Sequence, residues 1–81
     1  MDYSVVLGRN VRRIRKSQDL SQEELGFRAE MKRSYVSDLE RGLRNPSLKA
    51  LGRLAEALSV DLCALVRTSD PTNDTPGGQQ T

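Results

Sequence analysis

The chain has 81 residues, a formal net charge of +2, one cysteine and no histidine. This length suits one small domain with a thin core, and the cysteine and histidine counts exclude an intramolecular disulfide and a zinc finger. No apolar run approaches the roughly 18 residues of a membrane span, and the N-terminus lacks a signal-peptide pattern. We therefore expect a cytoplasmic protein with no membrane partner, no metal and no cofactor.

Positive charge is concentrated in the first 67 residues. Residues 1–67 hold all 13 Lys and Arg residues and nine of the 11 Asp and Glu residues, which leaves this region at +4. Such a basic balance permits a polyanionic partner without requiring one. Residues 68–81 contain no apolar side chain and carry only Asp70 and Asp74 as charged groups, so we expect a disordered polar tail there.

Apolar residues recur at helical spacing through residues 1–67 and predict five helices and no strand, so the expected fold class is all-α. In chain order, the predicted helices span about 3–18, 22–29, 33–41, 48–58 and 62–66. The apolar face of the first helix includes Leu7, Val11 and Ile14. We expect the residues at its start to cover the core as well: Tyr3, Val5 and Val6.

Polar residues mark where most of these helices begin and end. Ser21 and Glu24 have the spacing of a capping box at the start of the second helix. Gly42 suits a left-handed C-cap after the third helix. Ser47 and Asp61 precede the fourth and fifth helices as N-caps.

The second and third predicted helices, joined by a tight turn over residues 30–32, are the feature that points to function. In the third helix, Val36 and Leu39 face inward. A contiguous outward strip carries four hydrogen-bonding side chains: Arg33, Ser34, Ser37 and Asp38. Such a helix can lie in the major groove of DNA, where an arginine at its start prefers guanine. Asp38 either accepts a hydrogen bond from cytosine or fixes the rotamer of Arg33.

Taken alone, this strip is more simply explained as a solvated helix face, but its neighbours favour DNA. Gln22 lies at the start of the second helix, where free N–H groups and the helix dipole attract a phosphate. Arg41, Arg44 and Asn45 follow the strip, where a DNA backbone would run. Gly26, inside the second helix, predicts a close crossing by the third helix.

Five segments of the chain carry a family resemblance: residues 11–15 (VRRIR), 20–25 (LSQEEL), 35–42 (YVSDLERG), 44–48 (RNPSL) and 54–60 (LAEALSV). In combination they resemble the Cro/repressor-type helix-turn-helix family, also called the xenobiotic-response-element-type regulators of bacteria and phages. The resemblance implies a compact five-helix, lambda-repressor-like DNA-binding domain over residues 1–67, with the helix-turn-helix at the second and third helices. Restriction–modification controllers, small phage repressors and stand-alone regulators fit it equally well.

The resemblance also implies roles for individual residues. Arg15 and Glu40 match a partly buried, structural ion pair that ties the first helix to the third. The positions that read bases are Arg33, Ser34, Ser37 and Asp38. The positions that contact the DNA backbone are Gln22, Lys32, Arg41 and Arg44. From their own chemistry and position we add Asn45 and Tyr35, whose ring either packs beside Val36 or, as we favour, brings its hydroxyl to a phosphate.

The chain departs from the family pattern at three positions. Glu30 stands where a turn glycine is usual, which costs about 1 kcal/mol or more if the backbone there is left-handed. Lys32 stands where Ser or Thr usually caps the recognition helix, and lysine is a poor cap. Gly26 replaces the usual alanine.

The predicted last helix gives two further expectations. Cys63 is expected to be a small buried side chain rather than a redox sensor, because no second cysteine or histidine accompanies it. Leu62, Leu65 and Val66 are expected both to close the core and to form a dimer interface.

These features predict a sequence-specific, double-stranded-DNA-binding transcriptional regulator that acts as a homodimer on a pseudo-palindromic operator. The alternative is a protein-interaction module, as in antitoxins that use the same fold to hold a partner protein. Non-specific binding to nucleic acid is a third possibility. An enzyme is not expected, because the chain has no histidine, no acidic cluster and no phosphate-binding glycine loop.

Overall fold

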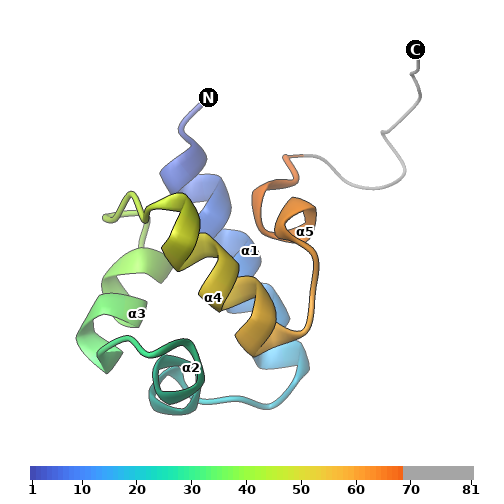
Figure 1. Ribbon diagram of the computed structural model, residues 1–81. Helices are drawn as coiled ribbons and strands as arrows, with labels where there is room; N and C mark the ends of the chain where they lie inside the picture. The colour runs from blue at the N-terminus through green and yellow to red at the C-terminus, as the bar shows by residue number, and fades with distance from the viewer. Residues whose placement is uncertain (69–81) are drawn as a thin grey trace.

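The structure is a computed structural model that describes residues 1–68 of the chain. Within these residues it contains five helices and no strand, so the predicted all-α fold class is confirmed. The helices are α1 (Tyr3–Ser17), α2 (Gln22–Ala29), α3 (Arg33–Glu40), α4 (Leu48–Leu58) and α5 (Leu62–Val66). Figure 1 shows α4 in front of α1, with α2 and α3 to one side of this pair and α5 to the other. The polar tail predicted over 68–81 lies outside the described residues from residue 69 onward.

The ends of the helices follow the capping chemistry of the sequence. At the start of α2, the amide of Glu24 donates to the Ser21 hydroxyl at 3.0 Å, while Glu24 accepts from the Ser21 amide at 2.9 Å. The Ser47 hydroxyl caps α4, and the Asp2 carboxylate caps α1 without having been predicted to do so. Asp61 occupies the predicted N-cap position of α5, but its side chain accepts no capping hydrogen bond.

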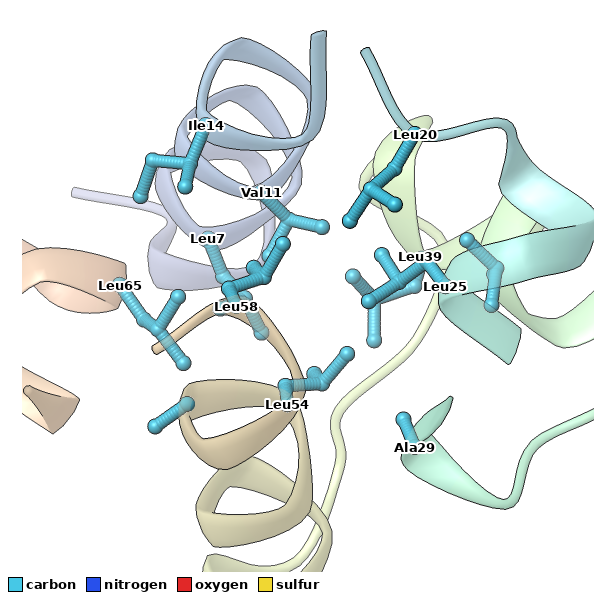
Figure 2. Close-up of a cluster of buried hydrophobic side chains, with 12 residues drawn as sticks. Leu7, Val11, Ile14, Leu20, Leu25, Ala29, Leu39, Leu54, Leu58 and Leu65 are labelled. Carbon is cyan, nitrogen blue, oxygen red and sulfur yellow. The ribbon is translucent and has the colours of Figure 1, made fainter. Parts of the chain in front are cut away.

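One apolar core lies between the five helices, and Figure 2 shows its side chains converging from all of them. Its buried members are Leu7, Val11, Ile14, Leu20, Leu25, Ala29, Val36, Leu39, Leu54, Ala55, Leu58 and Leu65. Val36 and Leu39 therefore face inward, as their spacing predicts, and fix which side of α3 is left for solvent.

Three expectations about buried side chains fail at the two ends of this fold. Tyr3 and Val5 are 58% and 41% exposed, because the first turn of α1 extends past the core, which begins at Leu7. Cys63 is exposed rather than buried. The five-residue helix α5 turns only Leu65 fully toward the core, and Cys63 lies on another side of it.

Two glycines allow close backbone approaches. A Cβ atom on Gly8 would lie 2.4 Å from the carbonyl oxygen of Leu39 and 2.7 Å from that of Glu40, so α1 meets the last turn of α3 directly at this point. A Cβ atom on Gly26 would lie 2.6 Å from the carbonyl oxygen of Met31. Val36 and Arg33 of α3 follow at 3.5 and 3.6 Å, so α3 does pass close to Gly26 as predicted, but the tightest contact is with the turn after α2.

Amide side chains fasten the ends of the last two helices to α1. The Asn10 side-chain nitrogen donates to the carbonyl oxygens of Leu65 and Arg67, at 2.9 Å each. The Gln18 side-chain nitrogen donates to the carbonyl oxygen of Leu58 at 2.7 Å. These bonds satisfy carbonyl groups that a helix end leaves without a partner. None of the described helices has the length and apolar character needed to cross a membrane.

Candidate nucleic-acid interface

Helix α3 presents the predicted strip on its outer side. Arg33 and Ser34 are exposed in its first turn, and Ser37 and Asp38 are half-buried one turn later. The apolar side of the same helix is anchored by Val36, which is fully buried. The strip therefore stands on a rigid part of the fold, as a surface that enters a DNA groove requires.

The turn between α2 and α3 is strained at the position where glycine is usual. Glu30 has φ 60° and ψ 45°, a left-handed conformation that a side chain disfavours. Lys32 occupies the N-cap position of α3 without a capping hydrogen bond from its side chain, as lysine chemistry predicts. Its exposed side chain is left beside the first turn of α3.

A buried network holds α3 against α1 and α2. The Nε and Nη2 atoms of Arg15 donate to the two carboxylate oxygens of Glu40 at 2.6 and 3.0 Å, and Nη1 donates to the carbonyl oxygen of Leu20 at 2.8 Å. The exposed fractions of the two charged side chains are only 10% and 2%. The Glu40 carboxylate raises the pKa of Arg15, since it stabilises the charged guanidinium.

Gln22 belongs to this network, a role that the sequence analysis misses. Its side-chain nitrogen donates to Glu40 at 3.1 Å, so the start of α2 is tied to the end of α3. The second hydrogen of that nitrogen and the free backbone N–H groups at the start of α2 are the donors that remain for a phosphate there. The sequence signals for this contact were weak: Gln22 follows the cap Ser21 directly, and Glu40 ends the next helix.

Asp38 does not contact Arg33 and instead holds two arginines beyond the end of α3. One carboxylate oxygen accepts from Arg41 at 2.7 Å and the other from Arg44 at 3.3 Å. The Arg41 guanidinium, with Arg44 as a second cation, holds the pKa of Asp38 below its ordinary value. Arg44 also lies over the ring of Tyr35, with its central carbon 5.2 Å from the ring centroid.

Asn45 is fixed by the start of α1. Its side-chain oxygen accepts a hydrogen bond from the hydroxyl of Ser4, 41 positions earlier in the chain. The side-chain nitrogen is the group left to donate to a DNA phosphate. Ser4 is therefore a residue of the candidate interface that sequence reasoning missed, because no local pattern links it to the loop after α3.

A cavity of about 350 Å³ lies next to these residues, between the first turn of α3 and α4. Its lining residues are Glu30, Met31, Lys32, Ser34, Tyr35, Arg44, Ala50 and Arg53. Three of them are cationic and one is acidic, so the interface continues as a mainly basic hollow beside the outer strip of α3.

Helix α5 offers only part of the predicted dimer interface. Leu62 and Val66 are each 39% exposed, whereas Leu65 is fully buried. Leu65 closes the core and has no side-chain surface to give a second subunit, so it has to be withdrawn from the predicted interface. Among residues 1–68, no three His, Cys, Asp or Glu side chains are grouped closely enough to hold a metal ion.

Comparison with known proteins places this geometry among related chains. A family model described as helix-turn-helix matches residues 11–65. The chain is 42% identical over 78 residues to an uncharacterized HTH-type transcriptional regulator, y4dJ, of Sinorhizobium fredii, and the match covers 96% of this chain and 97% of that one. It is 44% identical over 57 residues to control protein C.BamHI of Bacillus amyloliquefaciens, covering 69% and 70% of the two chains.

A solved structure resembles the fold as well as the sequence. The restriction-modification controller protein C.AhdI from Aeromonas hydrophila superposes with a TM-score of 0.74 and 42% sequence identity. The superposition covers 76% of this chain and 94% of that protein.

Proposed function

The chain belongs to the helix-turn-helix family, and we propose that it is a sequence-specific DNA-binding regulator of transcription. One observation carries the proposal: the first turn of α3 exposes Arg33 and Ser34 while the Arg15–Glu40 pair and the core hold that helix rigidly. A rigid helix with exposed hydrogen-bonding groups at its start is what major-groove reading requires.

We assign base contacts to the outer strip of α3 and backbone contacts to its surroundings. Arg33 donates to the O6 and N7 atoms of a guanine, and Ser34 and Ser37 lie beside it as shorter donors or acceptors. Gln22 faces a phosphate at the N-terminus of α2. The other residues that face phosphates do so through their side chains: Lys32, Tyr35, Arg41, Arg44 and Asn45. These contacts set the register of the protein on the duplex, and the base contacts supply specificity.

We propose further that the regulator is a homodimer that acts on DNA in the cytoplasm. The exposed Leu62 and Val66 side chains of α5 give an apolar patch for a second copy of the chain. A two-fold dimer would place one α3 in each of two major-groove segments about 34 Å apart. The operator is then a pseudo-palindrome whose half-sites are separated by one helical turn.

Selection from randomised duplex DNA tests the proposal, followed by titration of the enriched duplex against a scrambled one at fixed salt. We expect a two-fold symmetric motif that binds at least about a thousandfold more tightly than scrambled DNA. Sedimentation of the complex then gives two chains per duplex. Absence of any enriched motif would contradict the proposal and favour the antitoxin-like alternative, for which the next measurement is the identity of a co-purifying protein.

A further inference from the structure

We propose that Asp38 is a positioning residue that withholds Arg41 and Arg44 from phosphates in the wrong register and so raises the specificity of DNA binding. This inference rests on the proposed function. It also changes the role predicted for Asp38, from reading a base to controlling two backbone contacts.

The geometry joins one carboxylate to both arginines. The two oxygens of Asp38 are each taken by a different guanidinium, at 2.7 Å for Arg41 and 3.3 Å for Arg44. The arginine side chains are 64% and 50% exposed, whereas that of Asp38 is 28% exposed. The carboxylate is therefore the more buried partner, and it draws two more exposed cations toward the outer strip of α3.

The contacts leave each arginine partly available. Each guanidinium has five N–H groups, and the contact with Asp38 uses one terminal nitrogen of each. Arg44 is also held over the Tyr35 ring. These contacts hold the remaining N–H groups of both arginines in one orientation. They can donate to a phosphate only when α3 has docked in the register that brings a phosphate to that position.

When the protein binds DNA in a wrong register, it has to break these contacts. Non-specific binding depends on phosphate contacts, to which flexible cations adapt. For Arg41 and Arg44 to adapt, they must leave the Asp38 carboxylate, which acts as an internal substitute for phosphate. Because exposed ion pairs are weak, the expected penalty on non-specific binding is about threefold to tenfold.

Substituting Asp38→Asn tests the inference, since asparagine keeps the shape of the side chain and removes its charge. Affinities are measured for the enriched operator and for a scrambled duplex over a range of salt concentrations. We expect binding to scrambled DNA to tighten about threefold to tenfold and its salt slope to steepen by about one unit. Operator affinity and its slope stay unchanged or decrease, so the specificity ratio falls.

Three further variants separate this role from a general charge effect. Glu23→Gln removes the same charge from an exposed residue of α2 and is expected to change scrambled and operator binding equally. Asp38→Glu retains the carboxylate and is expected to keep scrambled binding within about twofold of the original protein. In an Arg41→Ala, Arg44→Ala background, Asp38→Asn is expected to change scrambled binding by no more than Glu23→Gln does.

The outcomes distinguish this inference from the proposed function. If the original protein fails to prefer its enriched duplex over the scrambled one, the proposed function is wrong. If it does prefer that duplex but Asp38→Asn tightens both duplexes equally or neither, only the role of Asp38 is wrong. Circular dichroism of each variant establishes that the protein keeps its helical content when the affinities are measured.

Discussion

The Arg15 guanidinium on α1 and the Glu40 carboxylate at the end of α3 form a bidentate ion pair that is almost completely buried. Arg15→Ala is expected to lower the free energy of unfolding by about 3–5 kcal/mol, because it leaves a buried carboxylate without its cation. Urea unfolding at neutral pH measures the change. The double replacement Arg15→Met, Glu40→Leu removes both charges and is expected to recover most of the loss.

The contact between α1 and α3 at Gly8 leaves no room for a side chain. Gly8→Ala is expected to destabilise the fold by about 1–3 kcal/mol, because the new methyl group meets the carbonyl oxygens of Leu39 and Glu40. Gly52 in the middle of α4 is the matched control, since no atom lies within 4 Å of a Cβ built there. Gly52→Ala should therefore stabilise the protein by about 0.4–1 kcal/mol. Equal effects at the two positions would contradict the close approach at Gly8.

The left-handed backbone at Glu30 is strained by its side chain. Glu30→Gly is expected to raise the free energy of unfolding by about 1 kcal/mol, because glycine adopts φ 60° without a steric cost. Glu30→Ala keeps the strain and removes only the carboxylate, which lies 3.9 Å from Arg53 on the surface. This control should change stability by less than about 0.5 kcal/mol. Thermal unfolding of both variants compares the two effects.

The capping box makes stability depend on acid pH. Hydrogen bonds from the amide and hydroxyl of Ser21 hold the pKa of Glu24 below its ordinary value of 4.5. A lowered folded-state pKa gives stability that is present above the ordinary value and is lost as pH falls through the folded value. Glu24→Gln retains an acceptor but does not titrate, so its stability deficit at pH 7 should shrink as the pH falls below 4.5. A deficit that stays constant down to pH 2.5, roughly two units lower, would contradict this origin.

Arg33 and Arg44 are expected to affect DNA binding in different ways. Arg33→Ala should relax the base preference at one position of each half-site, with a loss of about 1–3 kcal/mol of discrimination. Arg44→Ala should weaken operator binding and reduce its salt slope by about one unit, and should weaken binding to scrambled DNA less, because Asp38 withholds Arg44 from phosphates there. A randomised-site selection measures the first effect and a salt titration the second. An unchanged base profile for Arg33→Ala would remove it from the set of base-reading residues.

Local chemistry explains which parts of the fold were predictable from sequence. The bounds of α2 were predicted because Ser21 and Glu24 form a capping box, a pattern readable within four residues. The inward face of α3 followed from the spacing of Val36 and Leu39. The exposure of Cys63 did not, because a helix of five residues is too short for its spacing to define one buried face.

Long-range contacts of the candidate site were not predictable in the same way. Arg44 reaches Asp38 because the loop after α3 folds back, with the Leu43 amide donating to the Asp38 carbonyl oxygen at 3.0 Å. Ser4 meets Asn45 across 41 positions of sequence. Asn10 did leave a signal, since it interrupts the apolar spacing from Leu7 to Ile14. A polar residue on a buried stripe needs partners, and only the fold identifies them.

The two hydrogen bonds from Asn10 to the end of α5 would fix the geometry of the proposed dimer. In a homodimer formed through Leu62 and Val66, each α3 is connected to the interface through its own α5. The distance between the two α3 helices can therefore vary only as far as each α5 can move relative to its own domain. Asn10 clamps the carbonyl groups of Leu65 and Arg67, so the joint is stiff. One base pair added between the half-sites moves the second half-site by about 3.4 Å along the DNA axis and rotates it by about a tenth of a turn. The affinity of the protein for its operator would then depend on the spacing of the half-sites as strongly as on their base sequence.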